Sequence, residues 1–285
     1  MSLSVVVRQR FPRTRRNVAS IRSGWTDLGE QTRFYLQTLR SLSDVFIYHR
    51  AELLRQVAAM SLGTGALAII GGTVVVMGFL TMATAGSLAT QGYNQLSQVG
   101  VEALMGFVAA FVLTRLIIPV TAAIAFAATI GAGATAQLGA MRINEEIDAL
   151  EVMGIRSIAY LAATRVVAGI VVVVPLYCIG LQFGYLACES IVVAYYGQSR
   201  GVYQHYFETF FIPADAVRSF IVTIAEVVVV MLIHTFHGYT ASGGPAGVGR
   251  AVGRATRTSL IVSALVVLFV TLALYGQSGH FNFAG

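Results

Sequence analysis

The sequence predicts an all-α integral membrane protein, and three observations lead to this fold class. Of the 285 residues, 56% are hydrophobic and 11% are charged, whereas soluble domains carry about 25% charged residues. The mean hydropathy is +0.74. Apolar runs long enough to cross a bilayer recur along the chain. Together they predict five transmembrane helices, an N-terminal amphipathic interfacial helix, and a short charged helix in water after the second crossing.

The first sixty residues are predicted to stay out of the hydrocarbon. Residues 1–40 are polar and rich in Arg, as in a cytoplasmic segment that meets anionic lipid head groups. Apolar and charged residues mix over 41–60, which is typical of an amphipathic helix lying in the interface. No apolar core stands beside a small-residue cleavage site, so we expect no cleavable signal peptide.

Five apolar stretches follow, and each is expected to form one crossing. The second is too long for one straight crossing at about 1.5 Å per residue, so we expect Pro119 to kink it and its end to leave the bilayer. A polar stretch over 86–100 separates the first two, and aromatic residues over 189–214 suit an interfacial or external helix. The expected spans are about 62–85, 103–140, 158–188, 216–236 and 258–275.

All nineteen basic residues are Arg, and their distribution predicts the topology. Most lie in the N-terminal segment, in the charged helix after the second span, and in the loop 238–257. The stretch 86–100 has none, and 189–214 has only Arg200. The positive-inside rule therefore places the N-terminus in the cytoplasm and the C-terminus outside. No nucleic-acid-binding motif accompanies the Arg residues, so we expect no nucleic-acid partner.

The segment from Phe126 to Arg156 joins a tightly packed membrane helix to a charged helix. Its first half presents two adjacent rows of small side chains, which let a neighbouring helix approach closely. In its second half Ile143, Ile147 and Leu150 recur with an amphipathic period among six charged residues. This helix is either an ordinary loop helix or a docking element for a soluble partner. The two rows are Ala127, Gly131, Thr135, Gly139 and Ala128, Ala132, Ala136, Ala140.

The glycine-rich loop 238–257 does not fit a nucleotide-binding site. Gly244 to Gly249 matches the first half of a P-loop, but Arg250 and Ala251 stand where Lys and Ser or Thr must hold phosphate and Mg²⁺. We therefore predict that this chain does not hydrolyse ATP. We interpret the loop as a flexible basic turn that begins the last span.

The His and Cys residues give no pattern for a metal site. His234 and His237 share a helical spacing of three, but no nearby Cys or acid completes a ligand set. Cys178 and Cys188 lie in an apolar run, and we interpret them as packing residues rather than as a disulfide or metal site.

Two ionisable residues inside predicted spans, Arg115 and Glu226, are candidates for function, because charges in hydrocarbon are costly. The alternative for each is an interhelical ion pair or a side chain that reaches the interface. Glu102 and Asp215 are expected nearer the surface. A membrane-embedded hydrolase would need a nucleophile such as Ser219 activated near Glu226, and the spacing does not support one. We predict no catalytic residue.

Two motifs resemble those of the MlaE/YrbE family of lipid-transport permeases. The stretch from Ala128 to Gly154, ending in QLGAMRINEEIDALEVMG, resembles the family signature, and GGPAGVGRAVGRAT resembles its second cytoplasmic motif. The resemblance covers roughly residues 45–276. The closing YGQSGHFNFAG and the Arg-rich front resemble the actinobacterial, Mce-associated branch, particularly its B-type permeases.

The resemblance implies a permease subunit of an ABC system in the bacterial plasma membrane, with no cofactor of its own. It implies three kinds of partner: a second homologous permease, a cytoplasmic ATPase dimer that binds ATP and Mg²⁺, and periplasmic MCE-domain proteins. The implied cargo is a membrane lipid of fatty-acid or sterol type, with import favoured. Export or maintenance of phospholipid asymmetry is the alternative. A lipid-modifying enzyme and a passive scaffold are the rival functions.

The resemblance also assigns the charged helix the role of a coupling helix, which sits in a groove of the ATPase. Arg115 and Pro119 match an Arg and a Pro that precede this motif in the family. Leu116, Thr129 and Gln137 stand where many bacterial members carry ionisable residues. We hypothesise that a non-identical partner permease supplies the missing charges. The implied coupling residues are Glu145, Glu146, Ile147, Asp148, Leu150, Glu151, Met153 and Gly154.

Overall fold

The computed structural model describes residues 28–62 and 68–275 of the chain. Within these ranges five helices are long and apolar enough to cross a membrane. The predicted fold class, an all-α membrane protein with five crossings, is therefore confirmed. The expectations for residues 1–27, for the start of the first span at 63–67 and for the tail at 276–285 lie outside the described residues.

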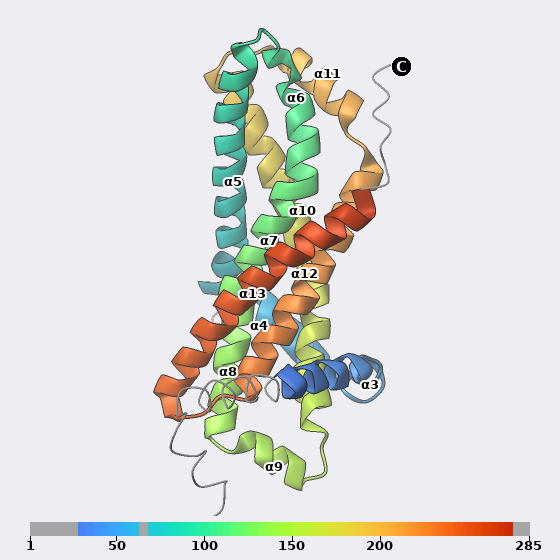
Figure 1. The fold of residues 1–285 in the computed structure, drawn as a ribbon, viewed down its shortest axis with the longest axis vertical. Helices are drawn as coiled ribbons and strands as arrows, with labels where there is room; N and C mark the ends of the chain where they lie inside the picture. The colour runs from blue at the N-terminus through green and yellow to red at the C-terminus, as the bar shows by residue number, and fades with distance from the viewer. Residues whose placement is uncertain (1–27, 63–67, 276–285) are drawn as a thin grey trace, which may run out of the picture.

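The N-terminal helices lie across one end of the bundle (Figure 1). Residues 28–40 are helical, although no helix was predicted there. Phe34 anchors this helix, because its buried ring lies with its centroid 5.5 Å from that of Phe236. The amphipathic segment that follows is divided at His49 into two helices. They are α3 (Leu42–Tyr48) and α4 (Arg50–Leu62).

The first crossing is α5 (Ala68–Ser97), which continues well past the expected end at residue 85. The stretch expected to be a polar loop is thus mostly helix. Ala85 and Ala89 explain the difference, because they share one face of the helix and pack in the same buried cluster as Met105.

The second crossing is a continuous helix of 42 residues, Glu102–Ile143. At about 1.5 Å per residue it is roughly 63 Å long, about twice the hydrocarbon thickness, so it extends beyond a bilayer as its length predicted. Two π-helical stretches interrupt it, and the first ends just before Pro119, which has no N–H to donate. Its segments are η1 (Glu102–Leu104), α6 (Met105–Val108), η2 (Ala109–Ile117), α7 (Ile118–Phe126), η3 (Ala127–Gly131) and α8 (Ala132–Ile143).

The third and fourth crossings follow a short helix called α9 (Glu146–Val152). Between them the predicted aromatic segment forms a helix that is not one of the five crossings, α11, at the opposite end of the bundle from α9 (Figure 1). Tyr203 on α11 is buried in the same cluster as Met105. The remaining segments are η4 (Ile158–Ala163), α10 (Thr164–Ser190), η5 (Ile191–Tyr195), α11 (Arg200–Phe210) and α12 (Pro213–Tyr239).

The last helix, α13 (Gly244–Tyr275), corrects the interpretation of the glycine-rich loop. Most of the predicted flexible turn over 238–257 is the first part of this helix, because Gly247, Ala251 and Ala255 recur at helical spacing and are buried. The helix runs diagonally across one side of the bundle (Figure 1). In the most apolar stretch of α13 only 17% of the residues are buried, whereas 50% are buried in the corresponding stretch of α12. Much of α13 therefore faces away from the described chain.

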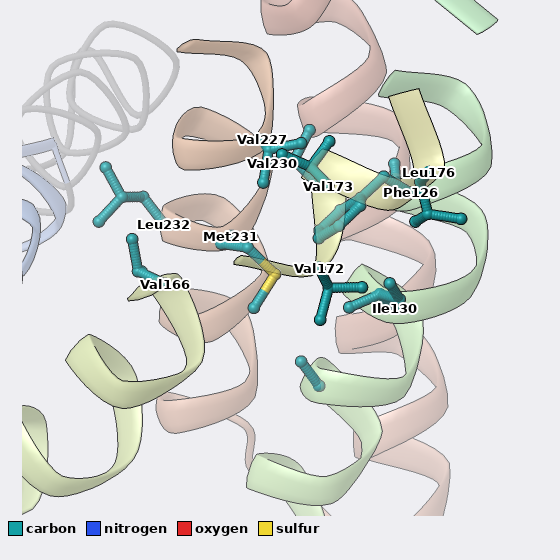
Figure 2. Close-up of a cluster of buried hydrophobic side chains, with 12 residues drawn as sticks. Phe126, Ile130, Val166, Val172, Val173, Leu176, Val227, Val230, Met231 and Leu232 are labelled. Carbon is teal, nitrogen blue, oxygen red and sulfur yellow. The ribbon is translucent and has the colours of Figure 1, made fainter. Parts of the chain in front are cut away.

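The central core lies where α7 and α8, α10 and α12 meet. Figure 2 shows its labelled side chains converging from these helices. Phe126 comes from α7, Val173 from α10, and Val227 and Met231 from α12. These side chains are apolar and tightly packed, so the core holds three crossings together by dispersion and shape.

The contact between α8 and α12 is closest where small residues face each other. A methyl group added at Gly238 of α12 would lie 2.8 Å from the Cβ atom of Leu138 and 2.9 Å from the carbonyl oxygen of Thr135. A methyl group at Gly131 would lie 2.7 Å from the ring of His234. The two helices therefore meet at the distance of backbone contact.

We predict that Gly238→Ala lowers the melting temperature of the purified protein, because the added methyl overlaps the backbone of Thr135. Overpacking of this kind costs about 1–3 kcal/mol. Gly133→Ala is the matched control, since nothing lies within 4 Å of its added methyl and Ala favours the helix. Equal melting temperatures for the two variants would contradict the close approach of α8 and α12.

Candidate functional site

The helix α9 projects from one end of the bundle (Figure 1). It is shorter than the predicted charged helix over 142–153, because α8 continues to Ile143 and a turn follows. Glu145 in this turn has a φ of 60°, a left-handed conformation that costs a non-glycine residue about 1–2 kcal/mol. Gly154, with a φ of 77°, closes the other end. Two left-handed residues thus fix the direction in which α9 leaves its neighbours.

The inner face of α9 is apolar and packs on the ends of two crossings. Ile147 is fully buried in one cluster with Leu138 of α8 and Leu161 of η4. Leu150 is half-buried against the same cluster. The amphipathic spacing seen in the sequence therefore identifies the residues that attach α9 to the membrane helices.

Polar contacts also tie α9 to the bundle. The Ser157 hydroxyl donates to Oε1 of Glu151 at 2.6 Å, and the Tyr239 hydroxyl at the end of α12 donates to the same oxygen at 2.9 Å. Both hydrogen bonds lower the pKa of Glu151, and the bond from Ser157 has the larger effect. Arg142 of α8 pairs with Asp148 at 2.6 Å. The α9 helix is thus attached to α8, to α12 and to the start of the third crossing.

The outward side of this end carries apolar and acidic side chains together. Val152 is 89% exposed and Met153 is 66% exposed, and Glu145 and Glu146 are also exposed. Exposed apolar side chains grouped at a projecting tip are typical of a protein contact. Val152 was not predicted as a contact residue, because an apolar residue in an amphipathic helix is expected to face inward.

The interfacial helices are linked to the same end of the bundle. Arg156, after α9, pairs with Asp44 of α3 at 3.1 Å. The Tyr160 hydroxyl of η4 donates to Glu52 of α4 at 3.2 Å. Burial disfavours the charged carboxylate of Glu52, but hydrogen bonds from Arg55 and its other partners outweigh burial and lower the pKa of Glu52.

The two predicted rows of small residues face different ways. In the first row, the Thr135 hydroxyl lies 2.7 Å from Nδ1 of His234, and Nε2 of that ring lies 3.1 Å from the Ser259 hydroxyl. His234 therefore joins α8, α12 and α13. The second row is exposed or half-exposed, on the outside of the chain. The buried row is Ala127, Gly131, Thr135 and Gly139, and the outward row is Ala128, Ala132, Ala136 and Ala140.

Arg115 forms an interhelical ion pair near the α11 end of the bundle. Its Nε donates to Asp215 in the first turn of α12 at 2.8 Å, and Arg218 donates to the other oxygen at 3.0 Å. The Arg115 guanidinium also lies 4.0 Å from the ring centre of Phe111. Asp215, expected nearer the surface, is 5% exposed. The pair is the structural alternative considered for Arg115, and no local pattern indicated its partner.

Glu226 lies fully buried in α12, and neither carboxyl oxygen has a hydrogen-bond partner among the described residues. It is the α12 residue that lines a groove of about 540 Å³ between the second crossing and α13. Ser263 and Thr271 line the same groove, and their hydroxyls also lack partners within the described part of the chain. The other lining residues are Leu116, Val120, Ala123, Ile124, Leu260, Ala264, Val267, Leu268 and Leu272.

The sequence model of the family Permease MlaE matches residues 62–273, which include the first four crossings, all but the last two residues of the fifth, α9 and the groove. The chain belongs to the MlaE permease family. MlaE permeases are non-catalytic membrane subunits of ABC transporters, so the chain is a multi-pass inner-membrane permease. Membership implies an ATPase and periplasmic partners.

Curated relatives are similar over much of the chain. A probable ABC transporter permease of Rickettsia bellii is 26% identical over 245 residues, covering 86% of this chain and 93% of its own length. The intermembrane phospholipid transport system permease MlaE of Haemophilus influenzae is 28% identical over 196 residues, 67% of this chain and 74% of its own. The chloroplastic protein TRIGALACTOSYLDIACYLGLYCEROL 1 of Arabidopsis thaliana is 28% identical over 188 residues, 63% of this chain and 50% of its own.

We predict that Asp215→Ala destabilises this MlaE-family permease, because it leaves the largely buried Arg115 without its carboxylate. Breaking a buried pair costs about 3–5 kcal/mol. Adding Arg115→Leu should restore much of the lost melting temperature. Glu189→Ala is the control, since its pair with the exposed Arg200 contributes little. The ion pair is unimportant if Asp215→Ala melts no lower than Glu189→Ala.

Proposed function

We propose that this chain is the permease subunit of an ABC-type lipid transporter and that α9 contacts its ATPase. The observation that carries the proposal is the division of α9 into two sides. Ile147 and Glu151 hold the inner side to the bundle, whereas Val152 and Met153 are presented outward. Family membership supports an ATP-driven transporter, and the name of the Haemophilus influenzae relative supports a lipid as cargo.

The proposed topology places α9 and the N-terminus in the cytoplasm and the C-terminus in the periplasm. Basic residues support it, because Arg142 and Arg156 flank α9. Arg250, Arg254 and Arg257 lie in the first part of α13, which begins at the same end of the bundle (Figure 1). Arg residues at one end of the spans favour the cytoplasmic side.

A path for mechanical coupling follows from the contacts of α9. A displacement of α9 acts on α12 through Tyr239 and Glu151, and on α8 through Leu138 and Ile147. The α8 and α12 helices meet in backbone contact at Gly238, so they resist separation. We infer that they move as one rigid body when the ATPase pulls on α9, and that this movement alters the membrane half of the permease.

A second permease is the proposed partner within the membrane. Its contact surface would include the outward row of small residues and the open face of α13. Leu116 and Gln137 are exposed, and Thr129 accepts a hydrogen bond from Thr73 at 3.1 Å. A non-identical partner that brings charges to these three positions would complete the heterodimer.

The remaining parts of the assembly are proposed from the resemblance to the Mce-associated branch. They are a cytoplasmic ATPase dimer, which holds ATP and Mg²⁺, and periplasmic MCE-domain proteins. This chain would bind no cofactor itself. The proposed cargo is of fatty-acid or sterol type and the proposed direction is import. The alternative is export or maintenance of phospholipid asymmetry by the same architecture.

We predict that the double change Val152→Asp and Met153→Asp reduces co-purification of the ATPase at least tenfold. The reason is that it places two charges where the apolar side chains of Val152 and Met153 must be buried against the ATPase. The melting temperature of the permease should stay unchanged, since both side chains are exposed. Val99→Asp is the control, because Val99 is 72% exposed in the turn after α5, at the other end of the bundle. Normal ATPase recovery with the double variant would overturn the proposed role of α9.

A further inference from the structure

Glu226 occupies the middle of α12, and α12 is a membrane crossing. Its carboxyl group therefore lies near the centre of the bilayer, where an unpaired polar group is most costly. Both carboxyl oxygens are buried and lack a partner among the described residues. A side chain placed at this cost without a structural partner points to a ligand.

The ionisable groups nearest to Glu226 along α12 are already engaged. Asp215, with Arg115 and Arg218, lies eleven residues earlier, which is about 16 Å along a helix. His234 lies about two turns later and contacts Thr135 and Ser259. No Arg or His lines the groove within the described residues. The described chain thus leaves Glu226 without a counter-charge.

The groove beside Glu226 has the size and composition of a small-molecule site. Its volume of about 540 Å³ lies in the range of ligand pockets, about 300–1,000 Å³. Its polar lining consists of Glu226 and the unpartnered hydroxyls of Ser263 and Thr271. The rest of the lining is apolar. A few polar groups on an apolar wall fix the orientation of an apolar ligand.

We propose that this groove binds one apolar molecule with a single uncharged hydroxyl, which hydrogen-bonds to Glu226 and Ser263. A phosphate or carboxylate head would meet an acidic side chain, and the described part of this chain places no cation beside it. An ammonium head would have to leave water for the centre of the bilayer. A hydroxyl both donates and accepts, so it satisfies the carboxyl group without bringing a charge. The inference rests on the proposed lipid-transport function and names the class of molecule that the groove takes.

The test is photolabelling of the purified permease in phosphatidylcholine vesicles. The probe is a diazirine-bearing hexadecanol, compared with the corresponding diazirine-bearing hexadecanoic acid and a diazirine-bearing phosphatidylcholine. We expect the alcohol to label peptides of α7 and α13 that line the groove, at least fivefold more than the acid or the phospholipid. Equal labelling of the groove by the three probes would overturn the proposal.

Variants connect the labelling to the carboxyl group. Glu226→Leu should reduce alcohol labelling of the groove at least fivefold, whereas Glu226→Gln, which can still hydrogen-bond, should retain most of it. Glu208→Leu is the matched control, because Glu208 is exposed on α11, away from the groove. Ser263→Ala is a milder change that preserves packing, and it should reduce labelling about threefold. Unchanged labelling in both Glu226→Leu and Ser263→Ala would overturn the proposal.

Two further readouts separate this inference from its rivals. Alcohol labelling should persist in the complete complex. Loss of alcohol labelling on assembly would show that another subunit fills the groove, and it would overturn the proposal that the groove binds a small molecule. Co-purification of the ATPase is measured on the same variants. If the groove is not labelled but the ATPase is retained, the proposed ligand site is overturned and the proposed transport function stands. If the α9 variant fails to release the ATPase, the proposed function is overturned and the ligand site is not tested by that result.

Discussion

The backbone contact between α8 and α12 is the constraint on which the rest of the structure depends. It exists because Gly238 has no side chain, so its backbone lies directly against the backbone of Thr135, and because Gly131, at the end of η3, leaves room for the ring of His234. The ring of His234 then joins the pair to α13 through Thr135 and Ser259. Three helices are thereby held in one arrangement by small residues and two polar contacts, in a medium where there is no hydrophobic driving force between helices and close packing has to supply the attraction.

This arrangement explains how the short helix α9, which lies outside the five crossings, is mechanically connected to them. The α8 helix leads directly into the turn at Glu145, and α12 ends at Tyr239, which donates to Glu151. Two of the three attachments of α9, those to α8 and α12, therefore belong to one packed unit. A surface helix with few internal hydrogen bonds would be marginal by itself, and its order here comes from the bundle. The proposed coupling role follows from this attachment together with the exposed apolar tip.

Hydropathy predicted the crossings well, because a run of apolar residues long enough for the bilayer has few other interpretations. It failed for the glycine-rich segment, where local composition indicated a flexible turn. There, tertiary contact overrides low helix propensity: Gly139 of α8 faces Val248 of α13 so closely that an added methyl would lie 2.9 Å from it. The partner of Arg115 was also beyond local reasoning, because Asp215 lies far along the chain. Composition identified both small rows, but only packing shows which is buried.

The central claim is that α9 and α12 move as one body when ATP binds to the partner ATPase. Spin labels at positions 149 on α9 and 217 at the start of α12 report on it directly, because Ala149 and Val217 are exposed and neither belongs to the proposed ATPase contact of Val152 and Met153. Cys178 and Cys188 would first be replaced, and the distance between the labels measured by double electron–electron resonance in the complete transporter with and without bound ATP. The account predicts one distance distribution that does not change. A shift of several ångströms on ATP binding would show that α9 moves independently and would contradict the account.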